Sequence, residues 1–486
     1  MYSDNLTPSK PPAPDSYTQS RWTHTALRRR LLTGNWSQDL SDELEKHIPS
    51  DRRAAWGIPD MSSNVFKGVC NALSALYVEP PAVGVVGALE GVADQLLESG
   101  GIIDNGGLWP LMQRMQLFTI GLREMFLRVD VNERKGGILY RPVSPDYVWA
   151  SAPAGDPMNP DHLWELRLRM GPHRKLIWTY DRFDLRDLNN PIYEVRAVSA
   201  SGELAGDLTE IYLGGDMSGE SYPYRDSSGT PVMPYALYHA QLLGDQLFDP
   251  FTLAELVAGS LTSAVLHCFL VHICRDCSFP QRYVMGCGID AGTVYDADGT
   301  SRRIAIASDP ASILVFSPDQ EMAGMGQPVI GQFSAGGDES KLMQTITLYE
   351  RKLAQSAGIS PASVQKISGD PRSGYAIAMS KSDQRDFQRR FTGPMRRGDL
   401  TTMRLSAIIA NRFLGHSFPE SGYRIEYSSI PLSPEEAKGL RDDIIDKMNN
   451  GLLTKIDAIR TLYPDLSDDQ AAEYLREIKR QTIEFG

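Results

Sequence analysis

The residues best suited to metal chemistry gather in one short stretch of this 486-residue chain, where Cys274 and Cys277 form a C-x-x-C pair. The neighbours with ligand side chains are His267, Cys268, His272 and Cys287. Zinc takes four ligands in a tetrahedron, usually as two close pairs. A second such pair is missing here, and the first ends an apolar stretch of the kind that often buries Cys and His. We therefore interpret these side chains as packing and expect no metal ion or other cofactor.

A second stretch resembles the start of a calcium loop, with the sequence Asp-Ala-Asp-Gly-Thr over residues 296–300. The third acidic position and the terminal Glu of a calcium loop do not follow. A hairpin turn at Asp-Gly explains the stretch better.

Motifs for nucleotide, acyl or metal-dependent catalysis are also missing, since the chain has no Walker A loop, no G-x-S-x-G and no H-E-x-x-H. The eight His residues show no acid–base spacing. We expect a protein that is not an enzyme. The alternative is an enzyme of unrecognised type working from the β-rich middle of the chain.

Charge is unevenly distributed along the chain, whose formal net charge is −12. Residues 366–412 hold ten Lys and Arg against four Asp, whereas residues 433–486 hold twelve acidic and eight basic residues. An acidic protein does not grip DNA through its phosphates as a whole, so any DNA contact is expected to be local. The arginines expected to face a neighbouring element, a neighbouring subunit or DNA are Arg385, Arg389, Arg390, Arg396 and Arg397.

Composition also limits the cellular setting. Residues 1–20 contain four prolines and no apolar core, which predicts a disordered arm and not a signal peptide. Five cysteines are too few for a disulfide framework, so assembly in a reducing cytoplasm is expected. Residues 256–273 lack Asp, Glu, Lys and Arg, and reach the lower limit for crossing a bilayer. We prefer a helix packed between protein neighbours, with a membrane-anchored scaffold as the alternative.

Hydrophobic periodicity predicts an α+β fold. Apolar residues at three- and four-residue spacing predict helices over residues 62–77, 85–99, 108–125, 250–277 and 338–357, and a long helical region to 414. Alternating and β-branched runs predict strands over 126–131, 138–141, 163–170, 175–180, 192–198, 208–213, 303–307, 312–316 and 423–427. A helical tail follows from residue 431. Two helices therefore bracket a β-rich insertion of roughly sixty residues.

The order of these elements resembles the portal proteins of tailed bacteriophages. Three sequence segments carry the resemblance: SSNVFKGVCNALSALYVEPP, SGYAIAMSKSDQRDFQRRF, and the ending from IPLSPEEAKGL to DDQAAEYLREI. The resemblance covers the chain apart from its arm. It implies a wing at residues 21–247 and 375–430, two stem helices at 248–279 and 338–359, a clip at 280–337, a channel loop at 360–374 and a crown at 431–486.

The same resemblance implies a structural role in the virion. Such a subunit forms a ring, expected to be a dodecamer, at one capsid vertex, and double-stranded DNA passes through it during packaging and ejection. Its partners would be the terminase large subunit, the head–tail adaptor and the major capsid protein, without a membrane. The residues expected to touch DNA from the channel loop are Lys366, Ser368, Asp370 and Arg372.

Overall fold

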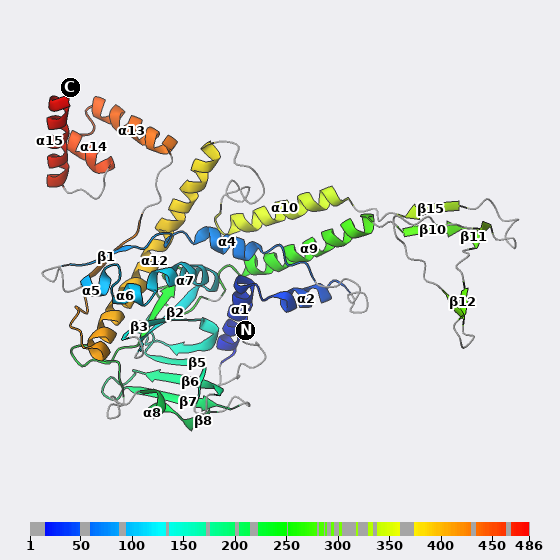
Figure 1. Cartoon of the computed structure of the whole chain (residues 1–486), viewed down its shortest axis with the longest axis horizontal. Helices are drawn as coiled ribbons and strands as arrows, with labels where there is room; N and C mark the ends of the chain where they lie inside the picture. The colour runs from blue at the N-terminus through cyan, green and yellow to red at the C-terminus, as the bar shows by residue number, and fades with distance from the viewer. Residues whose placement is uncertain are drawn as a thin grey trace.

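The structure is a computed structural model, and it shows a body from which two parts project (Figure 1). It describes residues 15–48, 59–86, 94–132, 136–171, 175–199, 204–213, 222–249, 251–278, 281–285, 287–288, 293–295, 301–303, 317–318, 329–333, 338–359, 374–428, 434–462 and 468–485. One projecting part is a pair of helices with small strands at its far end. The other is a group of C-terminal helices.

The first helix of the body is α1, Ser16–Thr33, and it begins inside the segment expected to be a disordered arm. The physical reason is a helix cap, which the proline-rich composition of the segment does not indicate. The Asp15 carboxylate accepts a hydrogen bond from the Thr18 amide at 2.7 Å. The expectation of an arm up to residue 20 is therefore wrong for its last residues, and residues 1–14 lie outside the described part. Helices α2 (Ser37–Glu45) and α4 (Val65–Leu73) follow.

The helix expected over residues 85–99 is wrong at Val85, which ends a strand, and right at Asp94–Leu97, whereas residues 87–93 lie outside the described part. Strand β1, Ala82–Val85, pairs antiparallel with β16, Tyr423–Glu426, more than three hundred residues away. That distant partner supplies the backbone hydrogen bonds of β1, a strand that the sequence did not predict. The helices that follow are the short α5 (Asp94–Leu97) and α6 (Ile102–Asn105) and the long α7 (Leu108–Leu122).

Two antiparallel sheets form the β part of the body. The three-stranded sheet has the order β3-β2-β9, from Gly137–Val143, Glu124–Asn132 and Tyr235–His239. The five-stranded sheet runs in chain order through β4 (Val148–Ser151), β5 (His162–Met170), β6 (Leu176–Asp184), β7 (Ile192–Val198) and β8 (Leu204–Asp207). Strands β2, β3, β5, β6 and β7 confirm the strands expected between residues 126 and 198, whereas β4, β8 and β9 were not predicted.

One strand expected from the sequence is a helix instead. Residues 208–213 were expected to be extended, but α8 covers Thr209–Leu213. The Asp207 carboxylate accepts hydrogen bonds from the amide and the hydroxyl of Thr209, which starts a turn where the apolar run alone indicates a strand.

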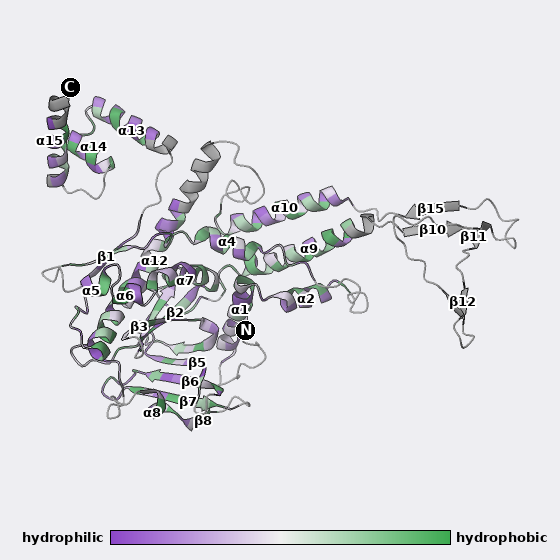
Figure 2. Ribbon diagram, in the orientation of Figure 1, coloured by the Kyte–Doolittle hydropathy of each residue, from purple (hydrophilic) through white to green (hydrophobic). Residues whose placement is uncertain are grey.

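The projecting pair consists of α9, Ala254–Ser278, and α10, Glu339–Ser356, which lie side by side (Figure 1). Helix α9 carries apolar residues along its length (Figure 2). The first residue of α10 is fixed by Asp338, whose carboxylate accepts from the Lys341 amide at 3.0 Å, as the sequence predicts. At the far end, β10 (Gln281–Met285) pairs antiparallel with β15 (Val329–Phe333).

The other strands at this end are short: β11 (Cys287–Gly288), β12 (Thr293–Tyr295), β13 (Ser301–Arg303) and β14 (Ser317–Pro318). The strand expected over 303–307 overlaps β13 only at Arg303. The rest of that segment and the strand expected over 312–316 lie outside the described residues.

The longest helix is α12, Gly374–Leu414, which packs against β2 and β9 of the body. The C-terminal helices are α13 (Pro434–Asn449), α14 (Lys455–Leu462) and α15 (Asp468–Phe485). Helices and antiparallel sheets are thus largely segregated along the chain, so the fold class is α+β, as the sequence predicts.

Candidate functional site

The base of the α9–α10 pair is the candidate site, because four elements of the chain meet there. Helix α9 packs against α2, α4 and α10, and α10 also packs against α4. Gly259 of α9 makes the close approach possible: a Cβ at this position would lie 2.3 Å from Cδ2 of Leu353 on α10. The apolar side of α9 continues into the core through Leu256, Leu261 and Val265.

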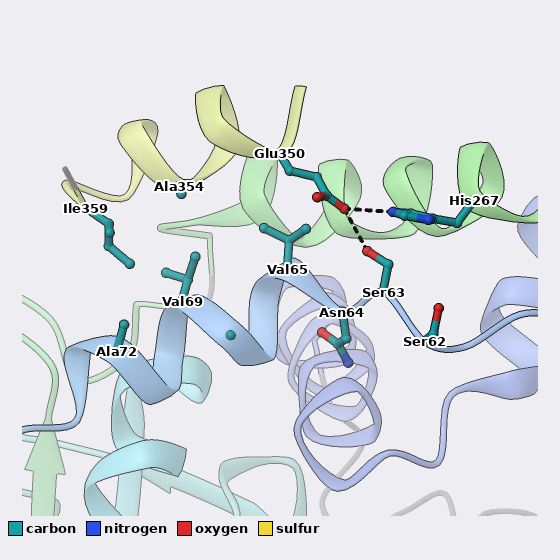
Figure 3. A pocket seen from close by; sticks show the side chains of 11 residues that line it. Ser62, Ser63, Asn64, Val65, Val69, Ala72, His267, Glu350, Ala354 and Ile359 are labelled. Carbon is teal, nitrogen blue, oxygen red and sulfur yellow. Dashed lines mark hydrogen bonds and ion pairs between the residues drawn. The ribbon is translucent and has the colours of Figure 1, made fainter. Parts of the chain in front are cut away.

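A single carboxylate oxygen ties three of these elements together (Figure 3). Oε1 of Glu350, on α10, accepts hydrogen bonds from the hydroxyls of Ser263 on α9 at 2.7 Å and of Ser63 before α4 at 2.8 Å. Nε2 of His267, also on α9, lies 3.0 Å from the same oxygen. We call these four side chains the Glu350 junction. It links residues 287 positions apart in the sequence and fixes where the helical pair leaves the body.

The junction shifts the pKa of both ionisable groups toward an ion pair. The hydrogen bond to Glu350 raises the pKa of His267, against the opposing effect of burial. For Glu350, burial favours the neutral form, but the hydrogen bonds from His267, Ser263 and Ser63 together outweigh it and lower the pKa. Both shifts favour the ion pair of a protonated His267 and an ionised Glu350.

Beside the junction lies a groove of about 360 Å³ between α4 and α10 (Figure 3). Its walls are mostly apolar, and Gly68 and Ala72 on α4 and Ala354 on α10 leave the space open. The remaining lining residues are Ser62, Asn64, Val65, Val69 and Ile359, together with Ser63, His267 and Glu350 of the junction. The groove ends at Ile359, just before residues 360–373, which lie outside the described part.

The four residues expected to contact DNA, Lys366, Ser368, Asp370 and Arg372, all fall in that same segment, so their placement is untested. The Asp-Gly turn at residues 296–300 also lies outside the described residues.

The five arginines named from the sequence lie on α12 and separate into different environments. Arg389 is strongly exposed, 3.9 Å from Asp386 one helical turn away, and Arg396 is exposed as well. Arg397 instead faces the body, where its guanidinium donates to Asn159 at 3.0 Å. Arg390 lies over the ring of its neighbour Phe391, and Arg385 is half-buried. Only part of the set is therefore positioned to meet another molecule.

The cysteine and histidine residues considered for zinc do not converge where the structure describes them. His267 belongs to the Glu350 junction, and the Cys268 thiol is directed at the Asp60 carbonyl. Cys274 is exposed, and the side chains of Cys277 and Cys287 lie outside the described set. Among the described residues, no group of three or more His, Cys, Asp or Glu is arranged to hold a metal ion.

Sequence reasoning missed the Glu350 junction, although it noticed His267. Ser260, Ser263 and His267 are polar residues on an otherwise apolar helix, and this spacing places them on one face. That signal indicates a buried polar contact but does not identify Glu350 as the partner, because the partner lies beyond the β-rich insertion.

One helix satisfies the length and composition of a membrane span, from Ala254 to Cys274. Half of its most apolar window is buried against other parts of the chain. Buried contacts with α4 and α10 are those of a core helix in a protein interior, which also passes this test.

No protein-family model and no curated protein matches the chain. Among solved structures, the chain is similar to one from the virion of a native gene transfer agent particle, with a TM-score of 0.35 and 12% sequence identity. The similarity covers 82% of this chain and 88% of that one.

Proposed function

We propose that this chain is a portal subunit of a tailed bacteriophage or a similar particle. It would form a ring, expected to be a dodecamer, at one vertex of the capsid, and conduct double-stranded DNA during packaging and ejection. It would work as a structural protein and not as an enzyme, located in the virion after assembly in the host cytoplasm.

The observation that carries the proposal is the α9–α10 pair. The two helices are distant in the sequence, yet they lie side by side and hold the β10–β15 module away from the body (Figure 1). In the portal interpretation α9 and α10 are the stem, the module belongs to the clip, residues 360–374 are the channel loop, and α13 to α15 belong to the crown. A projecting module of this kind presents a docking surface at a distance from the body.

Charge supports the role of a conduit. A channel must not hold the polymer that it conducts, and a net charge of −12 repels phosphate over most of the surface. A few local cations, with Lys366 and Arg372 as our choices, would then contact the passing duplex. Ser368 and Asp370 would lie beside them.

The partners follow from this arrangement. The clip would dock the terminase large subunit during packaging and the head–tail adaptor afterwards, and the wing would contact the major capsid protein. The β10–β15 pair is two-stranded, and an isolated pair of strands is only marginally stable, which fits a module completed by neighbours in a ring.

Electron microscopy of the purified full-length chain tests the proposal directly. We expect closed rings with a central channel, and class averages would give their symmetry. Uniform monomers without rings would contradict the proposal and favour an enzyme of the β-rich middle. A chain recovered only with detergent would instead favour a membrane-anchored scaffold using residues 256–273.

The channel cations have their own test. The double substitution Lys366→Glu with Arg372→Glu is expected to leave the rings intact and to reduce packaged DNA, because reversed charges repel the duplex. Packaged DNA is measured per particle by nuclease protection. The matched control reverses two residues of the C-terminal helices, Lys438→Glu with Arg441→Glu. Wild-type packaging in the first variant would show that these side chains do not contact DNA in transit.

A further inference from the structure

The link between the body and α9 passes over a buried carboxyl group. Asp249 and Thr252 precede α9, and their backbone and side chains fasten the link: the Thr252 hydroxyl donates to the Asp249 carboxylate at 2.7 Å. The Asp249 amide donates to Oε2 of Glu124 at 3.2 Å. Glu124, the first residue of β2, is 0% exposed.

The backbone at both ends of this contact is in an unusual conformation. Among the described residues, the only non-glycine residues with positive φ are Arg123, at 77°, and Leu253, at 66°. Arg123 immediately precedes Glu124, and Leu253 immediately precedes α9. Left-handed backbone is unfavourable for these side chains and persists only where surrounding contacts hold it.

The second oxygen of the carboxyl, Oε1 of Glu124, is buried without a hydrogen-bond partner in the structure. Three cations lie near enough to interact with the charge of Glu124, Arg21 and Arg28 on α1 and the adjacent Arg123, but all three guanidinium groups donate their hydrogen bonds elsewhere. Their acceptors are the carbonyls of Pro145 and Val148, the carbonyls of Gly121 and Thr252, and the side chains of Asp249 and Gln241. The other ionisable groups beside Glu124 are Tyr17 on α1, Asp249, and His239, which lies directly opposite Glu124 in the β2–β9 pair. An ionised Glu124 would therefore keep an unsatisfied, desolvated oxygen.

We propose that the link carrying Asp249, Thr252 and Leu253 is a clasp over Glu124, and that the clasp loosens when the Glu124 carboxyl becomes ionised. A neutral Glu124 carboxyl can stay buried under the closed clasp with the Asp249 amide as its one hydrogen-bond donor. An ionised carboxyl gains free energy by opening to water, and the strained backbone at Arg123 and Leu253 relaxes in the same step.

The electrostatics support this direction. Burial raises the pKa of Glu124 to about 7, with Arg21 as the main opposing charge. In an open clasp, the carboxyl is hydrated and its pKa returns toward the ordinary value of 4.5. Between these two values the closed form binds one proton more than the open form. The free energy of opening therefore falls as the pH rises from about 4.5 to about 7, and changes little above that.

Hydrogen–deuterium exchange of the full-length chain, in whatever assembly state it adopts, tests the inference. Amide protection at Thr252 and in the first turn of α9, corrected for the intrinsic exchange rate, is expected to fall by up to about tenfold per pH unit between pH 5 and pH 7 and then to level off. Glu124→Gln removes the ionisable group while keeping its shape. In that variant, protection in this segment is expected to be the same at pH 5 and pH 7.

The control is Glu255→Gln, which neutralises an exposed carboxylate in the first turn of α9 and should preserve the wild-type pH dependence. The inference is overturned if Glu124→Gln keeps that dependence. A wild-type segment whose corrected protection is flat from pH 5 to pH 8 would overturn it as well, even if Glu124→Gln fails to fold. Neither outcome depends on whether rings form, so the portal proposal is tested separately.

Discussion

At the scale of single residues, the chain relies on buried carboxylates that collect donors from distant segments. Asp399 on α12 is 0% exposed and accepts hydrogen bonds from the phenols of Tyr77 at 2.7 Å and Tyr238 at 2.9 Å. The Tyr427 phenol is a third donor. One side chain thereby joins α12 to the end of β9 and to the segments after α4 and β16.

The Asp399 cluster makes stability depend on pH. Burial raises the pKa of Asp399 to about 6, from 3.8, so the folded chain holds a proton that the unfolded chain releases. The free energy of unfolding from this group is therefore highest below pH 4 and is lost as the pH rises to 6. Asp399→Asn is expected to lower stability by about 1–3 kcal/mol, since an amide cannot accept three phenol donors equally. It should also remove this part of the pH slope.

Thermal unfolding at pH 4.5 and pH 7 checks this prediction. The control is Asp443→Asn, a change at an exposed aspartate of α13. If the stability of Asp399→Asn changes with pH as much as that of the wild type, another group is responsible for the pH dependence.

The Glu350 junction makes stability depend on pH in the same direction as the Asp399 cluster, but over a higher pH range. Because the pKa of His267 is raised, its contribution to stability is complete below pH 6.5 and is lost as the pH rises through the raised value. Glu350→Gln removes the charge that holds the proton on His267. The variant is expected to be less stable than the wild type by about 1–3 kcal/mol at pH 6, and the difference should shrink by pH 9.

This prediction is also measured by thermal unfolding, with Glu339→Gln at the start of α10 as the control. A difference that grows from pH 6 to pH 9 would contradict the assigned ion pair.

At the scale of elements, local patterns were sufficient where a segment's own residues determine its structure. The apolar spacing of residues 338–357 and the alternation of residues 163–170 predicted α10 and β5 correctly. The sequence failed where the structure of a segment depends on a distant partner. Segment β1 is a strand because it pairs with β16, more than three hundred residues away. The Glu350 junction could not be predicted for the same reason, since spacing identifies a polar face on α9 but not its distant partner.

The packing of α9 on α10 depends on Gly259. Replacing it with Ala places a methyl group against Leu353, so Gly259→Ala is expected to cost about 1–3 kcal/mol of stability. Combining it with Leu353→Val should cost less than the two single changes added together, because the smaller side chain gives the methyl group room. Chemical denaturation of the wild type, the two single variants and the double variant gives the four free energies of unfolding from which the coupling energy is calculated.

Gly68→Ala is the matched control, a helical glycine of α4 with no atom within 4 Å of the added methyl group. It should stabilise the chain by up to about 1 kcal/mol through helix propensity. Strict additivity of the Gly259 and Leu353 changes would mean that the two helices do not pack as described.

At the scale of the whole molecule, shape and charge are both polarised. The helical pair and the C-terminal helices leave the body in different directions (Figure 1). Positive charge concentrates on α12, whereas the segment of α13 to α15 is acidic. A ring requires a different surface on each side of the subunit, so that one side binds the other side of the next copy and the rotation closes. Segregated charge provides two unlike surfaces of this kind.

The exposed arginines of α12 are our candidates for one of these surfaces. Arg389 and Arg396 are exposed, whereas Arg397 is bonded within the body. Arg389→Glu with Arg396→Glu is expected to prevent ring closure at low salt, because the reversed charges would repel the acidic surface of the next copy. The fold of the single subunit should be unchanged, since neither side chain is buried. Mass photometry at 50 mM and 500 mM salt measures the fraction of rings.

Raising the salt concentration should weaken wild-type rings and narrow the gap between wild type and variant, as expected for exposed charges within a screening length. Arg424→Glu, an exposed arginine on β16 that pairs with Glu426, serves as the control and should assemble normally. Equal assembly of the double variant and the wild type at 50 mM salt would exclude α12 as the charged side of the interface. It would then place the closing contacts on the apolar surface of the helical pair, where Val271, Met343 and Leu348 are exposed.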